Sequence, residues 1–150
     1  MSIVIIYTSF SCASCQKAKK WLKKHGVAYK EKNLFSDKFQ QTDLDLILKR
    51  CIHGFDDIIS KRSKVYKESN INFKNLNTTS MKKSIMENRG ILKRPIMIED
   101  QKIQIGYNKE DIRIFMPIKL RNYLLQNDTT FYKENKKYEV LLKNFFKTNK

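Results

Sequence analysis

Residues 3–15 read IVIIYTSFSCASC, and this stretch decides the fold class of the chain. Its first five residues form a short apolar run, rich in β-branched side chains, of the kind found in a buried strand. A turn with two serines, Ser9 and Ser11, follows, and either serine can cap a helix. Cys12 and Cys15 then stand one helical turn apart. The stretch therefore predicts a strand that leads two cysteines to the N-terminus of a helix.

The predicted helix runs from Cys12 to His25. Its apolar residues recur at i, i+3, i+4 and i+7 while most lysines fall elsewhere, and Gly26 is placed to end it. A second strand near residues 27–33 completes a β-α-β unit. Further along, a helix opened by Thr42, with Asp45 three residues later as a capping box, is expected to turn one face inward; that face holds Leu44, Ile47, Leu48 and Cys51.

The second half of the chain returns to strands. We expect a short helix and a loop in residues 55–77 and a helix over 79–88, with Met81 and Ile85 inward. A strand at 94–98, entered through Pro95, and a strand at 102–106 form a hairpin. Short helices follow at about 108–115 and 117–126.

This order, β-α-β, helical insert, ββ-α, predicts an α/β protein with a thioredoxin-like mixed sheet. A CxxC motif after the first strand of a β-α-β pattern is the redox signature of that fold. We expect one domain over 1–128 with a helical insert at about 36–90. Residues 129–150 are then a basic amphipathic C-terminal extension, with a helical stripe formed by Tyr138, Leu141, Leu142 and Phe145.

The net positive charge of this chain is much larger than that of an average globular protein. Thirty-one Lys and Arg against fifteen Asp and Glu give a net charge of +16 and a pI near 9.8. A lysine-biased composition explains this, and so does a polyanionic partner bound through counterion release. The sequence shows no signal-peptide pattern and no run of about 20 apolar residues, so we expect a cytoplasmic protein that does not span a membrane. There, a disulfide is normally transient.

The two cysteines of the CxxC motif carry the chemistry. At a helix N-terminus, Cys12 faces the positive end of the helix dipole and unpaired backbone N–H groups, which stabilise a thiolate. Cys15 can then resolve a sulfenic acid or a mixed disulfide. Half of a zinc site and a pair of inert thiols are the alternatives. Zinc needs four ligands, and the remaining candidates (Cys51, His25 and His53) form no second pair, so we predict no metal. Cys51 is better explained as a buried apolar residue.

Basic residues are expected near the thiols. In thioredoxin-like folds the proline at the position of Pro95 is usually cis and faces the CxxC pair. Arg94 would then direct its guanidinium toward Cys12 and hold a thiolate or an oxyanion. The cluster Ser60–Lys64 is either a solvated loop or a weak phosphate-binding patch.

Several motifs together resemble the Spx regulators of low-GC Gram-positive bacteria, which belong to the arsenate-reductase-like branch of the thioredoxin fold. The resemblance covers about residues 3–126. It is carried by Tyr7-Thr8-Ser9-x-Ser11-Cys12-x-Ser14-Cys15, by Gly54 with Ile58-Ile59-Ser60-x-Arg62-Ser63-Lys64-Val65, by Leu92-x-Arg94-Pro95-Ile96 and by Gly106-Tyr107-Asn108.

The resemblance implies a transcriptional regulator rather than an enzyme. It implies binding to the C-terminal domain of the RNA polymerase α subunit, and a change of promoter use when Cys12 and Cys15 form a disulfide. Gly54 would be the close-approach point for the α subunit, together with Lys49, where the family commonly has Arg. A basic cluster near the switch would comprise Arg62, Lys64 and Arg94. No cofactor is implied.

The C-terminus departs from the family pattern. The family ends in a short tail recognised by the ClpXP protease, but this chain has about 20 basic and aromatic residues there, so the tail does not support ClpXP control. The extension can pack back on the domain, contact promoter DNA or polymerase, or stay frayed. No base-reading module is visible, so we expect DNA contact to be indirect or through the basic surface.

An enzyme is the competing function. The same Cys12 and Arg94 would suit an arsenate reductase or a thiol-disulfide oxidoreductase. Arsenate reduction in this branch usually uses one nucleophilic cysteine with several converging arginines. The second cysteine and the insert with Arg62 and Lys64 favour a switch instead.

Overall fold

The computed structural model describes residues 2–127 and 135–149, and its centre is a four-stranded sheet. The strand order is β2-β1-β3-β4, with bounds Val4–Thr8 (β1), Tyr29–Asn33 (β2), Ile96–Glu99 (β3) and Lys102–Ile105 (β4). β1 runs parallel to β2 and antiparallel to β3, and β3 and β4 form a hairpin. The sheet is mixed, which confirms the predicted thioredoxin-like architecture.

Each face of the sheet is covered by its own hydrophobic cluster, because successive strand residues point to opposite faces. Val4, Ile6 and Met97 belong to a cluster with the helices α1 (Ala13–Lys24), η3 (Asp111–Phe115), α6 (Ile118–Asn127) and α7 (Lys136–Thr148). Tyr7, Ile96 and Ile98 belong to the other cluster, which contains the insert.

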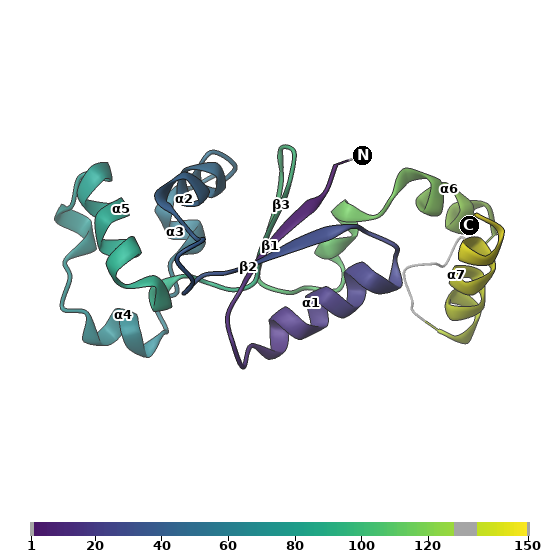
Figure 1. The fold of residues 1–150 in the computed structure, drawn as a ribbon, viewed down its shortest axis with the longest axis horizontal. Helices are drawn as coiled ribbons and strands as arrows, with labels where there is room; N and C mark the ends of the chain where they lie inside the picture. Colours follow the sequence, from purple (N-terminus) through teal and green to yellow (C-terminus); the bar gives the residue numbers. More distant parts are fainter. Residues whose placement is uncertain (1, 128–134, 150) are drawn as a thin grey trace.

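The insert consists of short helices at one end of the molecule. They are α2 (Gln41–Leu48), α3 (Phe55–Ile58), α4 (Lys64–Glu68), η1 (Phe73–Asn75), α5 (Thr78–Glu87) and η2 (Arg89–Ile91). Figure 1 shows them on the left of the sheet, while α6 and α7 lie on the right. Met81 and Ile85 are buried in α5, as predicted. The segment 55–77 is more helical than expected.

The predicted cap of the insert's first helix was wrong. α2 begins two residues before Asp43, after Gln40, whose backbone N–H donates to Asp43 Oδ2 at 3.0 Å. The predicted pair, Thr42 and Asp45, does not cap the helix. Asp43 is buried, and its Oδ1 also accepts from Tyr7 Oη (3.0 Å) and Lys32 Nζ (2.7 Å). These contacts with β1 and β2 select the helix start over the local capping pattern.

The C-terminal extension packs back on the domain, which was one of the three alternatives for this segment. In α7, Tyr138 and Leu142 are 1% and 4% exposed and belong to the cluster of α1 and α6. Phe146 lies against Gly26, where an added Cβ would stand 2.6 Å from the ring. Residues 129–134 lie outside the described part of the chain. Across the described residues, no helix has both the length and the apolar character needed to cross a membrane.

Candidate redox site

Cys12 and Cys15 form a disulfide at the N-terminus of α1, with their Cα atoms 5.2 Å apart. Cys12 is the N-cap residue, so neither Ser9 nor Ser11 takes the role predicted for it. The Cys12 Sγ accepts a hydrogen bond from the Cys15 N–H at 3.1 Å. The sharp turn before it is made by Ser11, whose φ is +54°. The sulfur therefore occupies the place that a serine oxygen holds at other helix starts.

The two sulfurs differ in their access to solvent. Cys15 is 1% exposed and packs in the interior, whereas Cys12 is partly exposed. The first turn of α1 contains no acidic residue that would reduce the positive potential around the Cys12 sulfur. For the reduced protein we therefore expect Cys12 to be the sulfur that meets an oxidant and Cys15 to be the resolving thiol, which stays a prediction.

Pro95 lies beside the loop that carries the cysteines. The Arg94–Pro95 peptide bond is cis, as predicted. In the antiparallel register Tyr7 stands opposite Ile96, which places Pro95 next to Thr8, at the end of β1 where the CxxC loop begins. The Pro95 carbonyl accepts from the Gly106 N–H at 2.7 Å, so the cis peptide is held between the two strands.

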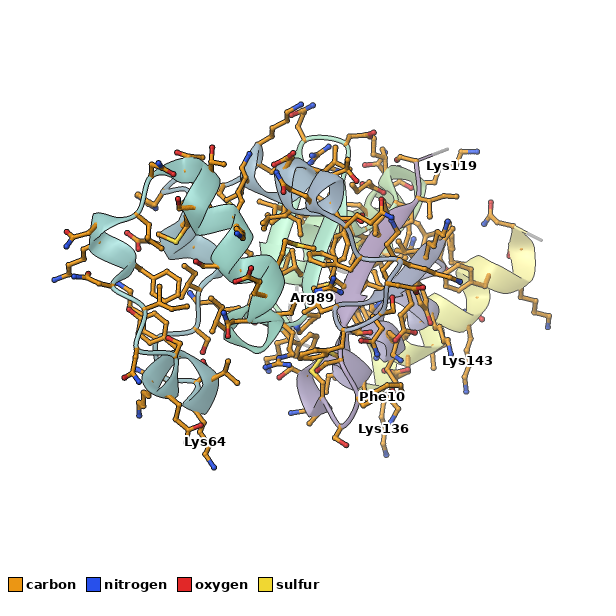
Figure 2. The ribbon with its side chains drawn as sticks, turned by 60° about the vertical axis from the view of Figure 1, so that its left-hand side comes forward. Phe10, Lys64, Arg89, Lys119, Lys136 and Lys143 are labelled. Carbon is orange, nitrogen blue, oxygen red and sulfur yellow. A yellow bond between two sulfur atoms is a disulfide. The ribbon has the colours of Figure 1, made fainter. Side chains whose placement is uncertain are left out.

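The structure places the basic residues on the insert side of this edge. Arg94 Nη2 donates to the Gly90 carbonyl (3.1 Å), and its guanidinium lies over the Phe35 ring, 5.6 Å from the centroid. Arg62 and Lys64 are exposed at α4. Figure 2 shows Lys64 pointing outward from that helix. The contacts of Arg94 are thus to η2 and to the segment after β2, and its predicted approach to Cys12 stays a prediction.

The loop that leads into α4 is nevertheless bound through the backbone to the segment before Arg94. Ile59 and Leu92 form an isolated antiparallel bridge, in which Ser60 N–H donates to Ile91 O (2.7 Å) and Lys93 N–H to Ile58 O (2.8 Å). Val65 of α4 packs against Gly90, where an added Cβ would stand 2.8 Å from it. These contacts place α4 and the loop before it against the segment that leads to Pro95.

A polar network flanks the other side of the loop. Glu31 of β2 accepts from Thr8 Oγ1 (2.8 Å) and pairs with Lys19 Nζ (3.1 Å). Desolvation raises the pKa of Glu31, but the hydrogen bonds from Thr8 and Lys19 outweigh it and hold the pKa below its ordinary value. Lys19, which belongs to the same helix as the cysteines, is thus paired with a carboxylate, whereas Lys17 is exposed.

Gly54, the predicted contact point, is the N-cap of α3 with φ +61°, and a Cβ built there meets nothing within 4 Å. The loop before it is well anchored, because the Asp57 Oδ2 accepts from the N–H groups of both Ile52 and His53 at 2.9 Å. Lys49, the C-cap of α2, is exposed.

Sequence reasoning missed three residues: the exposed apolar side chains of Ile52 and Phe10, and Arg89. Ile52 is 88% exposed and Phe10 is 86% exposed. Both are apolar residues in loops, outside any periodic pattern, and that departure from periodicity was the available signal. Arg89 was also missed. Figure 2 shows it in the middle of the molecule, where it donates to the carbonyls of Leu34 (3.0 Å) and Ser36 (2.6 Å) and links η2 to the segment after β2.

Cys51 and His25 are explained by packing and hydrogen bonding within the fold. Cys51 is half-buried and donates to the Ile47 carbonyl (3.4 Å). Burial, with a smaller effect of Asp57, raises the pKa of the Cys51 thiol to about 11. His25 is fully buried at the end of α1. Among the described residues, no group of three or more His, Cys, Asp or Glu side chains is arranged to hold a metal ion.

Comparison with solved structures agrees with this architecture. An arsenate reductase from Vibrio cholerae aligns with a TM-score of 0.67 at 16% identity, covering 76% of this chain and 98% of that one. A putative ArsC family related protein from Bacteroides fragilis aligns with a TM-score of 0.65 at 20% identity, covering 75% and 96%. At this identity the likeness concerns the fold.

Sequence relatives are more specific. The ArsC family model matches residues 7–115. The global transcriptional regulator Spx of Staphylococcus epidermidis is 42% identical over 124 residues, which cover 83% of this chain and 95% of that protein. The protein of the same name from Listeria innocua is 40% identical over the same shares. The chain therefore belongs to the ArsC family and, within it, to the Spx group of global transcriptional regulators.

Proposed function

We propose that this chain is a redox-sensing transcriptional regulator that binds the C-terminal domain of the RNA polymerase α subunit and changes promoter use when Cys12 and Cys15 form their disulfide. Its relatives are named global transcriptional regulators, and the disulfide is present at the start of α1. The protein would act in the cytoplasm, where this disulfide forms under thiol or oxidative stress and is otherwise reduced.

The surface around Gly54 carries the polymerase part of the proposal. Open space over a glycine lets another backbone come close. Ile52 beside it presents an apolar side chain from a loop held by Asp57, so little order has to be gained on binding. Lys49 and a half-exposed Leu46 (38%) adjoin on α2. An apolar anchor with a basic rim suits a small protein partner.

The test measures how the purified C-terminal domain of the polymerase α chain binds to three variants. Gly54→Ala and Gly54→Arg share the backbone strain at φ +61°, so their difference reports the added side chain. Gly106→Arg is the matched control, because Gly106 also has a positive φ (+76°) and open space. We expect Gly54→Arg to lose binding at least tenfold relative to Gly54→Ala, with Gly106→Arg close to wild type. Equal binding by all three, or no binding by wild type, contradicts the proposal.

The switch has a separate test. Transcription in vitro from a thiol-stress promoter, with polymerase and reduced, oxidised or Cys12→Ala protein, should change with oxidation only for the chain that can form the disulfide.

For the basic cluster, Arg62→Gln, Lys64→Gln and Arg94→Gln should weaken this redox response while leaving disulfide formation intact. The bridge between Ile59 and Leu92, which joins the loop before α4 to the segment before Arg94, supports that expectation.

An arsenate reductase is the second candidate, because solved neighbours of the same fold carry that name and Cys12 is partly exposed. A reductase would turn over arsenate repeatedly with glutathione or thioredoxin as the electron donor, and the rate would vanish in Cys12→Ser. We expect no turnover above the level of Cys12→Ser, because the contacts of Arg94 are to Gly90 and Phe35 and the second cysteine favours a switch.

A further inference from the structure

One stripe of lysines runs along α1 away from its buried face. The buried residues Cys15, Ala18, Trp21 and Leu22 face the sheet. At 100° per residue, Lys17, Lys20 and Lys24 lie within about 60° of one another on a different side of the helix. Lys17 and Lys20 are exposed, and α1 contains five lysines and no acidic residue. The stripe leads from the CxxC motif toward the C-terminal end of the helix.

A second stripe follows α7. Its inward side holds Tyr138 and Leu142. Lys136, Lys143 and Lys147 share another side, at the spacing i, i+7 and i+11, and all three are exposed. Figure 2 shows Lys136 and Lys143 pointing away from the body of the molecule.

The two stripes meet where the helices touch. Lys24 Nζ lies 2.5 Å from the Glu139 carboxylate of α7 and 5.5 Å from the centre of the Tyr138 ring. A shallow groove of about 450 Å³ is lined there by Lys24, Glu139, Leu142, Lys143, Phe146 and Lys147. One groove is therefore lined by Lys24 at the end of the α1 stripe and by Lys143 and Lys147 of the α7 stripe, which brings the two stripes together at this point.

The charge of this surface is large for its size. The two stripes hold six lysines, and Glu139 is the one acid of the two helices, so together they carry +5. The other lysines of these helices lie outside the stripes, and one of them, Lys19, pairs with Glu31. The negative charge of Glu139 is paired with the positive charge of Lys24. Two helices of 12 and 13 residues are each about 18–20 Å long. Duplex DNA carries one charge per about 1.7 Å of axis, so each helix length faces on the order of ten phosphates.

The packing of α7 favours a nucleic acid over a membrane. An amphipathic helix binds a bilayer by burying its apolar side in the acyl region. In α7 that side is already occupied, because Tyr138 and Leu142 are in the protein core and Phe146 lies on Gly26. The exposed side of α7 holds Lys136, Lys143 and Lys147 together with one short apolar side chain, Val140, which is 55% exposed. Three lysines on one side suit contact with a phosphate backbone.

We propose that the lysine stripes of α1 and α7 form a surface that binds the phosphate backbone of duplex DNA without sequence preference. α7 lies beyond the ArsC-family match, which ends at residue 115, so this surface depends on the extension of this chain. It is distinct from the Gly54 surface, which belongs to the insert. A regulator with both surfaces could bind a partner protein and the neighbouring DNA together.

The test compares two triple variants by fluorescence anisotropy with a duplex of about 20 base pairs, of arbitrary sequence, and no polymerase. Lys136, Lys143 and Lys147 become Gln in the first variant. The control replaces Lys38, Lys74 and Lys83 with Gln; these are lysines on the insert side, so both variants lose the same charge. If each α7 lysine contacts one phosphate, the slope of log Kd against log salt falls by about 2 to 3 in the first variant.

The expected result is a loss of affinity of at least tenfold near 100 mM salt for the α7 variant and less than threefold for the control, with equal thermal midpoints. Equal losses in both variants would assign the binding to net charge and overturn the proposal. Tighter binding of wild type to single-stranded RNA than to the duplex would overturn it in favour of RNA. Binding to the polymerase α domain, measured separately, should be unchanged in both variants, so this test is independent of the proposed function.

Discussion

The Nε2 atom of His25 lies 2.6 Å from the hydroxyl of Tyr138, and both side chains are buried. The other ring nitrogen, Nδ1, lies 2.8 Å from the Trp21 carbonyl oxygen, which can only accept a hydrogen bond. Nδ1 therefore carries the proton, and Nε2 accepts from Tyr138. The imidazole also stacks on Trp21, with 3.9 Å between the centroids. This hydrogen bond joins the end of α1 to the C-terminal extension.

Replacing Tyr138 by Phe tests this link. The variant keeps the ring but removes the donor, so Nε2 of a buried imidazole loses its partner. We expect the free energy of unfolding to fall by about 1 to 3 kcal/mol. Chemical denaturation measures it, and Tyr123→Phe, a half-buried tyrosine in the same cluster, is the control. Equal losses in the two variants would show that the hydroxyl of Tyr138 has no special role.

Two replacements of Cys12 separate capping from redox chemistry. Cys12→Ser and Cys12→Ala both abolish the disulfide, but Ser supplies an oxygen that can accept from the Cys15 N–H, and Ala does not. Under reducing conditions we expect Ser to be more stable than Ala by about 0.5 to 2 kcal/mol. Thermal or chemical unfolding of the reduced proteins measures the difference. A more stable Ala variant would contradict the capping role of position 12.

Cys51 should react more slowly than Cys12. Burial raises its pKa from 9.0 to about 11, which lowers the thiolate fraction at neutral pH about a hundredfold. After reduction, alkylation near neutral pH followed by mass spectrometry should label Cys12 before Cys51. In a urea-unfolded control, Cys51 should react at the rate of an ordinary thiol. Early labelling of Cys51 in the folded protein would contradict its burial.

Asp43 should make stability depend on acid pH. Desolvation raises the pKa of Asp43, but the hydrogen bonds from Lys32, the Gln40 N–H and Tyr7 outweigh it and hold the pKa below its ordinary 3.8. A carboxyl with a lowered folded-state pKa stabilises the protein above the unfolded-state value, and this contribution is lost as pH falls through the folded value. Asp43→Asn should cost about 1 to 3 kcal/mol at pH 7.

The difference between wild type and Asp43→Asn should narrow as the pH falls below about 4, because the carboxyl of the unfolded chain then takes up a proton while the folded one, with its lower pKa, still resists it. Unfolding curves recorded from about pH 3 to about pH 7 measure this. Asp37→Asn, outside this network, serves as the control. A difference that stays constant over this range would show that the charge of Asp43 is not what stabilises the fold.

The sequence predicted the parts of this fold that depend on nearby residues. The run from Ile3 to Tyr7 became β1, the stripe through Trp21 became the buried face of α1, and the hairpin of β3 and β4 formed around Asp100. The cis peptide before Pro95 was also predicted correctly. The strands and the helix follow from strand alternation and helix periodicity, which act within a few positions, whereas the cis peptide followed from the expected thioredoxin-like fold.

Caps were predicted less well, because several residues compete for one position. Ser9 and Ser11 were suited to cap α1, yet Cys12 caps it. Thr42 was suited to start α2, yet Gln40 precedes the helix, since Asp43 is held by Tyr7 and Lys32 from the sheet. A local capping preference amounts to about 1 kcal/mol, and buried contacts from other elements exceed it.

The sequence by itself determined the position of Cys12 and Cys15 at a helix start, because a strand, a turn and a helix follow one another there without interruption. Only the tertiary structure decided that the extension packs on α1 through His25 and Tyr138, which are 113 positions apart. It also decided that Arg94 lies over Phe35 and that the lysines of α1 and α7 meet at Lys24. These contacts depend on which surfaces remain uncovered once the sheet has formed, and no local pattern records that.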